Sequence, residues 1–279
     1  TLTTLGVERS AGAGTAEITG GMGHRSFGFI TFAEETGENR EKDMKAKLIT
    51  LPNIITLANL LCGTLGIISM VSLQSAGALR VAFVLMLAAA LFDFLDGFVA
   101  RLTGQYSPVG AQLDSLADMV SFVVLPTVVA MKIYYLAGGY GAWSAVMLLI
   151  TACGALRLAR FNVSDDQKRE FVGLPVPACA LFVGAFGWYM SGRIGLPAAA
   201  WMQWAVLAAG VVLALLMVSP VSMFSLKFEG FGFAGNEVRY TYLLVSLVIV
   251  LVAGMPGVGL AILLYILYSL VIWLVGRCK

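Results

Sequence analysis

Long apolar runs constrain the fold of this chain more than any other feature of its sequence. A helix needs roughly 20 predominantly apolar residues to cross a bilayer. Runs of about this length lie at 52–73, 78–103, 112–138, 141–161, 174–192, 199–219, 238–255 and 257–275. Because backbone groups in lipid must bond within the protein, such runs predict helices. The sequence therefore predicts an all-α integral membrane protein with about eight transmembrane helices.

The composition supports a lipid environment and excludes several classes of protein. Hydrophobic residues make up 59% of the chain and charged residues 12%, whereas a soluble domain is about 25% charged. The net charge of +2 is too small to indicate nucleic-acid binding. His24, the single histidine, lies in the polar N-terminal segment, which excludes a Ser-His-Asp triad and a histidine-ligated zinc from the apolar body. The four cysteines lack metal-ligand spacing and indicate packing residues.

Basic residues gather at one end of the predicted helices. If eight helices leave both termini in the cytoplasm, the outer loops hold only Arg80 and Arg193. Cytoplasmic loops retain Lys and Arg, so the bias predicts this orientation. The thirteen residues on the inner side are Arg40, Lys42, Lys45, Lys47, Arg101, Arg157, Arg160, Lys168, Arg169, Lys227, Arg239, Arg277 and Lys279.

Residues 1–43 differ in character from the rest of the chain. They are rich in Gly, Thr and Glu and contain no apolar run long enough to span a membrane. Met44 begins a stretch that is typical of the start of a membrane protein. We therefore expect a polar N-terminal extension over 1–43, dispensable or disordered, followed by a transmembrane domain over 44–279.

Four aspartates interrupt the second and third apolar runs. The acidic residues between positions 43 and 165 are Asp93, Asp96, Asp114 and Asp118. A carboxylate at membrane depth costs about 2.5–3.5 kcal/mol even on the lenient insertion scale. Four of them within 26 residues therefore need a compensating reason.

The spacing of these aspartates gathers them in one hairpin over 78–138. Asp93 and Asp96 are three apart and share a helix face, and Asp114 and Asp118 are four apart and share another. The connection between the two helices contains a glycine and a proline, so an antiparallel hairpin is expected. The four carboxylates then meet near the cytoplasmic membrane surface.

Small residues accompany both pairs. Gly97 and Ala100 fall on the face of the first pair, which leaves room beside the carboxylates for a bulky group. Gly110 precedes Asp114 by four and continues the stripe of the second pair.

Four adjacent carboxylates repel one another, and two divalent cations would offset that repulsion. All-oxygen ligands suit hard ions such as Mg²⁺ or Mn²⁺. Two metals about 3.5–4 Å apart stabilise the entering and leaving oxygens of a phosphoryl displacement. A structural or proton-conducting polar cluster is the alternative, but Arg101 would neutralise only one of the four aspartates.

Residues 93–118 also carry a family motif. It runs Asp93, two residues, Asp96, Gly97, two residues, Ala100, Arg101, eight residues, Gly110, three residues, Asp114, three residues, Asp118. This pattern resembles the complete signature of the CDP-alcohol phosphotransferase family. The resemblance implies that Asp93, Asp96 and Asp114 bind divalent metal. It implies that Asp118 is a further metal neighbour and the general base. The residues implied to hold the CDP moiety are Gly97, Ala100 and Arg101.

Three further segments, 51–59, 155–163 and 171–178, resemble the phosphatidylserine synthase branch of that family. A sister branch typically carries arginine where this chain has Asn59. The resemblance covers roughly 50–225. It implies transfer of the phosphatidyl group from CDP-diacylglycerol to L-serine, giving phosphatidylserine and CMP. It also implies a homodimer in the plasma or inner membrane, with the active site facing the cytoplasm.

The acceptor and nucleotide pockets have further candidates. Serine presents a carboxylate, which a planar guanidinium recognises bidentately. Arg157 and Arg160 are three apart at the inner end of one predicted helix, with Asn162 nearby, so we assign these three to acceptor binding. Anchoring at the membrane surface is the alternative for the arginines. Asn53 and Thr56 are candidates for nucleotide contact, although Asn53 also suits a helix cap.

Other functions stay open from the sequence alone. An enzyme of the same family could use an archaeal lipid donor, or inositol phosphate or glycerol phosphate as acceptor. Phosphorylated acceptors would ask for more cationic residues around the pocket. Intramembrane prenyltransferases also use aspartates and Mg²⁺, but their two motifs lie far apart in sequence. A cation- or proton-coupled transporter would give metal-independent flux without CMP release, and inverted repeats would favour it.

Overall fold

The computed structural model describes residues 49–73, 75–163, 172–193, 199, 201–223 and 236–277. Within these ranges the secondary structure consists of helices joined by turns, with an isolated antiparallel bridge between Val172 and Ser222. These helices belong to one compact unit, Thr50–Lys279. The extension predicted over 1–43 lies outside the described residues.

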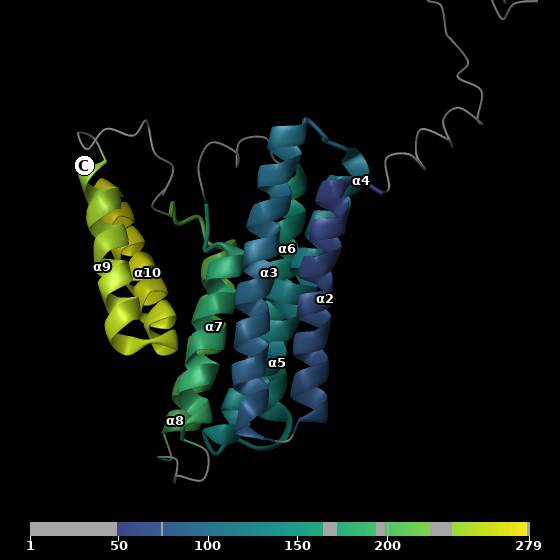
Figure 1. Ribbon diagram of the computed structural model, residues 1–279. Coiled ribbons are helices and arrows are strands. Elements are labelled where there is room, and N and C mark those ends of the chain that lie inside the picture. The colour runs from purple at the N-terminus through teal and green to yellow at the C-terminus, as the bar shows by residue number, and fades with distance from the viewer. Residues whose placement is uncertain are drawn as a thin grey trace, which may run out of the picture. The chain divides into compact units, whose positions relative to one another are not determined.

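Figure 1 shows the order of the helices along the chain. They are α2 (Leu51–Ser72), α3 (Ala76–Thr103), α4 (Pro108–Asp118), the π-helix η1 (Met119–Val124), α5 (Leu125–Leu136), the 3₁₀ helix η2 (Gly141–Met147), α6 (Leu148–Val163), α7 (Val176–Ser191), α8 (Met202–Val218), α9 (Glu237–Ala253) and α10 (Met255–Arg277). Each predicted apolar range coincides with one helix or one continuous helical stretch, so the all-α prediction is confirmed.

Five of these stretches are long and apolar enough to cross a membrane. They are Leu51–Ser72, Gly77–Thr103, Pro108–Leu136, Gly141–Val163 and Met255–Val275. Helices α7 and α8 are apolar but shorter. Large apolar side chains such as Leu61, Leu215 and Val252 are exposed on the outside of the helices. Lipid is the solvent that suits such a surface, and the protein is an integral membrane protein.

The interior is built by α2, α3, α5 and α7. Helix α2 packs along α3, and α7 packs against α3, α5 and α10; Figure 1 shows α2, α3 and α5 running side by side. Their shared core is apolar and contains Phe83, Phe122, Leu125 and Tyr134, all almost fully buried. The polar side chains that bear on function lie toward one end of this core.

The connection between α3 and α4 is fixed by local backbone chemistry. Gly104 ends α3 with φ 65°, a left-handed conformation that costs glycine little. Ser107 begins α4 by accepting a hydrogen bond from the backbone N–H of Gly110 at 2.9 Å, and Pro108 occupies the first turn. The aspartate-bearing helices are thus joined by a short, capped turn, as the hairpin prediction required.

The helix predicted over 112–138 is not uniform. It begins earlier, at Pro108, and changes to π-helical winding at Met119, directly after Asp118. A proline inside an α-helix cannot donate to the carbonyl four residues back and clashes with it. For Pro126 that carbonyl belongs to Phe122, and Phe122 lies within the wider π turn. The predicted helix over 141–161 likewise differs, because it starts with a 3₁₀ stretch.

Two glycines let neighbouring helices approach the π turn closely. A Cβ added to Gly63 on α2 would overlap the side chain of Ser121. One added to Gly154 on α6 would lie 2.7 Å from Cγ1 of Val123. Small residues at such contacts let helix backbones pack tightly in membranes. The π turn is therefore held between α2 and α6, and it fixes the end of α4 that carries Asp118.

Candidate active site

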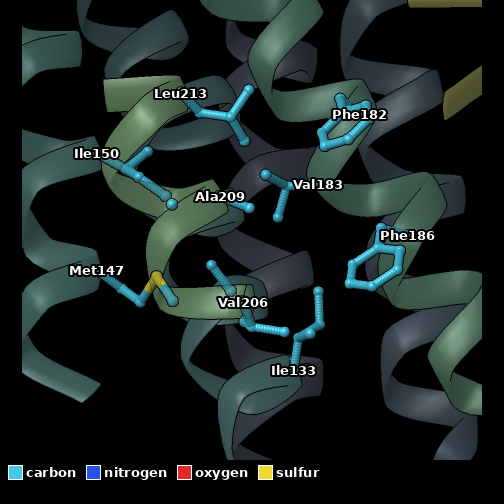
Figure 2. A pocket seen from close by; sticks show the side chains of 11 residues that line it. Ile133, Met147, Ile150, Phe182, Val183, Phe186, Val206, Ala209 and Leu213 are labelled. Atoms are coloured by element: carbon cyan, nitrogen blue, oxygen red, sulfur yellow. The ribbon is translucent and has the colours of Figure 1, made fainter. Parts of the chain in front are cut away.

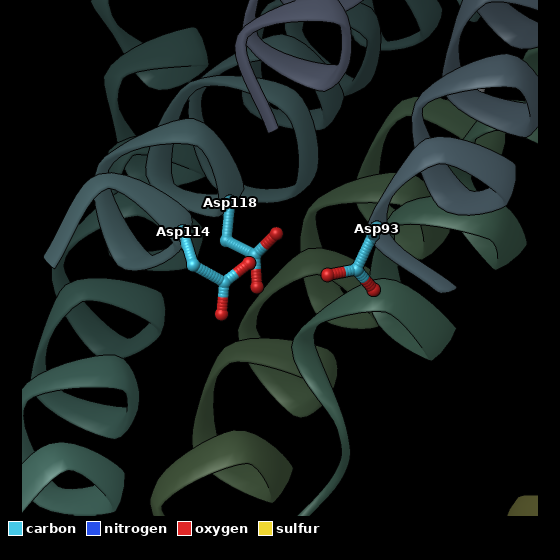
Figure 3. A group of neighbouring side chains, drawn as sticks. All are labelled: Asp93, Asp114 and Asp118. Atoms are coloured by element: carbon cyan, nitrogen blue, oxygen red, sulfur yellow. The ribbon is translucent and has the colours of Figure 1, made fainter. Parts of the chain in front are cut away.

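Three aspartates meet between α3 and α4. One carboxylate oxygen from each of Asp93, Asp114 and Asp118 lies within 4.8 Å of the other two. Figure 3 shows Asp93 on one helix facing Asp114 and Asp118 on another. The hairpin predicted from sequence therefore brings both aspartate pairs to one place.

The fourth aspartate, Asp96, lies beside this group but turns toward α2. It is close enough to the other three to interact with them electrostatically. Its side chain is 7% exposed, and its Oδ2 accepts a hydrogen bond of 2.6 Å from Oγ1 of Thr56. Asp96 thus contributes negative charge to the cluster while one of its oxygens is bonded to α2. Its role as a metal ligand stays a prediction.

The aspartate group fits a hard divalent cation. Oδ1 of Asp114 is buried and has no hydrogen-bond donor among the described residues. A buried carboxylate oxygen without a donor is costly, and a cation supplies the missing partner. Three carboxylates in reach of one point form the all-oxygen ligand set that Mg²⁺ and Mn²⁺ prefer.

Asp118 has a partner that the sequence analysis did not assign to the site. Nδ2 of Asn59, on α2, donates to Oδ1 of Asp118 at 3.3 Å. The two residues are 59 positions apart. Asn59 follows Asn53 and Thr56 at intervals of three and shares their face of α2, a signal that could have added it to the site. The bond itself forms because α2 packs against α4 and η1.

The residues assigned to CDP binding divide into two groups. Gly97 and Ala100 are half-buried, and Arg101 is exposed in the last turn of α3. A Cβ added to Gly97 would meet no atom of the described residues within 4 Å. The predicted space beside the aspartates is thus present at Gly97. In contrast, Asn53 and Thr56 are buried.

These two α2 residues contact the aspartate helices directly. Thr56 bonds to Asp96, as described above, and Oδ1 of Asn53 lies 2.9 Å from the position of a Cβ added to Gly110. Gly110 therefore admits the Asn53 side chain against α4. Nucleotide contact by Asn53 and Thr56 stays a prediction.

The three acceptor candidates have different surroundings. Arg157 is 8% exposed, and its Nε has no hydrogen-bond partner among the described residues. It lies near enough to Asp118 and to Tyr265 on α10 to interact with both electrostatically. Arg160 is exposed. Asn162 is also exposed and donates through Nδ2 to Oγ of Ser115 at 2.8 Å, next to Asp114 on α4. Arg157 is therefore the candidate whose side chain is buried toward the aspartates.

Comparison with known proteins identifies the family. Residues 49–275 match the CDP-alcohol phosphatidyltransferase family. The chain belongs to this family. The match extends beyond the range of about 50–225 over which the sequence analysis saw a resemblance, and it includes α9 and most of α10. The chain is thus a transferase of phospholipid biosynthesis, in a family that depends on divalent cations.

Three relatives with known names are described as enzymes that act with serine or form a serine lipid. An archaetidylserine synthase from Methanothermobacter thermautotrophicus is 38% identical over 176 residues, 62% of this chain and 69% of the relative. A CDP-diacylglycerol–serine O-phosphatidyltransferase from Methanocaldococcus jannaschii is 33% identical over 236 residues, 82% of this chain and 97% of the relative. The protein of that name from Helicobacter pylori is 31% identical over 237 residues, 81% and 92% respectively. The enzyme is therefore similar to phosphatidylserine synthases.

A separate apolar pocket in the enzyme does not belong to this site. It lies between α5, η2, α6, α7 and α8 and is lined by residues such as Ile133, Met147, Phe186 and Leu213 (Figure 2). Its lining offers apolar side chains and a glycine but no charged group. A pyrophosphate or an amino acid would find no polar partner there, so the aspartate site is the place for chemistry.

Proposed function

We propose that the enzyme transfers the phosphatidyl group of CDP-diacylglycerol to the hydroxyl of L-serine, giving phosphatidylserine and CMP. The observation that carries this choice of acceptor is Arg157, a buried guanidinium near Asp118 whose Nε has no hydrogen-bond partner in the part of the chain that the structure describes. The carboxylate of serine would supply the missing partner through charge-assisted hydrogen bonds. The names of all three relatives described above include serine, which supports the same acceptor.

The reaction needs a base, a positioned electrophile and a stabilised leaving group. In our proposal Asp118 takes the proton of the serine hydroxyl as its oxygen attacks the phosphorus that bears diacylglycerol. The bond from that phosphorus to the oxygen of CMP breaks, and CMP leaves with the electron pair. Asp93, Asp96 and Asp114, together with Asp118, would hold two divalent cations, Mg²⁺ or Mn²⁺. Bound there, the cations would neutralise the pyrophosphate and the departing CMP.

The remaining residues orient the two substrates. Gly97, Ala100 and Arg101 hold the CDP moiety on the open side of α3, with Asn53 and Thr56 on the neighbouring face of α2. Arg157 binds the serine carboxylate, and Arg160 and Asn162 complete the acceptor pocket at the end of α6. Positioning of this kind supplies much of the rate in transfers that involve little covalent chemistry by the protein.

The membrane arrangement follows from the basic residues. We infer eight membrane spans, with both termini and the aspartate site on the cytoplasmic side. We also infer that the enzyme lies in the plasma or inner membrane and works as a homodimer. We further infer that catalysis resides in 44–279. The site can then receive serine from the cytoplasm and CDP-diacylglycerol from the bilayer, since serine is water-soluble and CDP-diacylglycerol is a lipid.

Release of CMP by the purified protein in detergent tests the proposal. CDP-diacylglycerol and Mn²⁺ are supplied with serine, inositol phosphate or glycerol phosphate in separate reactions, and a CDP-activated archaeal ether lipid replaces the donor in a parallel series. We expect release that requires serine and metal. Release with another acceptor would leave the family intact but contradict the serine assignment. Metal-independent ion flux without CMP release would instead indicate the transporter.

Gly97→Ala separates a ligand pocket from a packing contact. The added methyl group meets no atom of the described residues within 4 Å, and alanine is favoured over glycine inside a helix by about 1 kcal/mol. We therefore expect an unchanged or higher melting temperature together with a KM for CDP-diacylglycerol raised about 5- to 150-fold, the cost of about 1–3 kcal/mol for overfilling a packed site. Steady-state kinetics and thermal melting measure both effects.

The matched control for this substitution is Gly77→Ala, at the opposite end of α3. It adds the same methyl group to the same helix and should leave the KM unchanged. An unchanged KM in Gly97→Ala as well would show that the nucleotide does not occupy the space beside Gly97.

A further inference from the structure

Asn59 is a buried residue of α2 whose side-chain amide is bonded to Asp118 on one side only. The residue is 0% exposed, and its Nδ2 donates to Oδ1 of Asp118 at 3.3 Å. Its own Oδ1 is buried without a hydrogen-bond partner among the described residues. A buried carbonyl oxygen without a donor is unfavourable. The amide is therefore oriented by Asp118, because turning it over would place its oxygen against a carboxylate oxygen.

The backbone of Asn59 is tied to the same part of the hairpin. Oγ of Ser121 donates to the carbonyl oxygen of Asn59 at 3.0 Å, from the π turn that begins directly after Asp118. One turn further along α2, Gly63 lets Ser121 approach without a Cβ in the way. One α2 residue thus fixes both the side chain of Asp118 and the turn that follows it.

We propose that Asn59 is a positioning residue for the transfer reaction. It holds one oxygen of Asp118, so that the other oxygen is presented to the acceptor hydroxyl and to the cation site formed with Asp93 and Asp114. Because the side-chain donor of Asn59 is bonded to Asp118, Asn59 acts on the reaction through Asp118. Partners of this kind typically change activity or metal affinity 10- to 100-fold when they are replaced. The proposal rests on the role of Asp118 in the proposed function.

Asn59→Leu and Asn59→Ala test it. Leucine keeps the branch at Cγ and lacks the donor, and alanine removes the side chain, so that an effect shared by both variants follows the lost hydrogen bond. The control is Ser69→Ala, which removes another buried polar side chain of α2, bonded only to the carbonyl of Gly66. Each variant is first compared with the wild type by thermal melting in detergent.

Two readouts are then taken from each protein. We expect kcat for CMP release to fall about 10- to 100-fold in both Asn59 variants, with the KM for CDP-diacylglycerol close to that of the wild type. Mn²⁺ binding, followed by the electron paramagnetic resonance signal of free Mn²⁺, should weaken by about tenfold or more. Ser69→Ala should change neither quantity.

Combination with Asp118→Asn distinguishes positioning from a general structural role. If Asn59 acts by positioning Asp118 as the base, Asn59→Leu should not reduce kcat further in the Asp118→Asn background, where the base is already lost. Equal losses of kcat in both backgrounds would overturn the proposal, as would wild-type kcat and Mn²⁺ affinity in folded Asn59→Leu. If the wild type itself releases no CMP with serine, the proposed function fails. The Mn²⁺ measurements then decide the role of Asn59 separately.

Discussion

Asp118→Asn is expected to lower kcat for serine-dependent CMP release by about 10²- to 10⁴-fold, the range found when a general base is lost. Asparagine has the shape of aspartate, and its carbonyl oxygen still accepts the hydrogen bond from Nδ2 of Asn59. It cannot take up the proton of the serine hydroxyl. The melting temperature and the KM for CDP-diacylglycerol should therefore change little, and steady-state kinetics on the folded protein measure the loss.

Asp118→Asn also removes a carboxylate from the three-aspartate group, so the metal requirement should rise in the variants of all three residues, whereas loss of the base is expected only in Asp118→Asn. Asp93→Asn and Asp114→Asn should raise the Mn²⁺ concentration needed for half-maximal activity, since each removes one carboxylate from the three-aspartate group. Removal of metal with EDTA should abolish CMP release, and added Mn²⁺ or Mg²⁺ should restore it. Glu237→Gln, an acidic residue in the first turn of α9, is the control for loss of a negative charge. Full activity in Asp118→Asn would contradict its assignment as the base.

The positions of the helices follow from the sequence because lipid leaves few alternatives. An apolar run of about 20 residues must satisfy its backbone internally, so each run in this chain forms a helix. Departures from regular winding are harder to predict. Pro126 marks a disturbed hydrogen bond, but whether the helix kinks, ends or widens depends on its neighbours. Here Gly63 and Gly154 admit a close π turn, and neither glycine reveals its partner in the sequence.

The same distinction holds within the site. The i,i+3 and i,i+4 spacings of the aspartates predict which carboxylates share a face, and the short turn at Gly104 predicts that the two faces meet. The spacing does not predict that Asp96 turns toward Thr56 or that Asn59 bonds to Asp118. Those contacts depend on how α2 packs against the hairpin.

Arg157 carries the second large expected effect. Arg157→Met should raise the KM for serine by about 10- to 150-fold, equivalent to about 1.5–3 kcal/mol for hydrogen bonds to a charged group. Methionine keeps an unbranched stem of similar reach without the charge. Arg157→Lys should also raise this KM, because an ammonium group cannot make the paired contacts of a guanidinium. The KM for CDP-diacylglycerol should stay near the wild-type value in both variants. Arg193→Gln, at the exposed end of α7, is the control for losing an arginine.

Stability separates this role from a structural ion pair with Asp118. If Arg157 served mainly to neutralise Asp118, its removal would leave this half-buried carboxylate without its counter-charge and would destabilise the fold, by less than the loss of about 3–5 kcal/mol found for fully buried pairs. If Arg157 instead binds the carboxylate of serine, the substrate-free enzyme holds a buried charge that its neighbours do not fully satisfy, since Nε has no hydrogen-bond partner among the described residues. Replacing it with methionine should then leave the melting temperature of the empty enzyme unchanged or raise it. In addition, serine should stabilise the wild type against heat but not Arg157→Met. A large fall in melting temperature with an unchanged KM for serine would assign Arg157 to the fold instead of the acceptor.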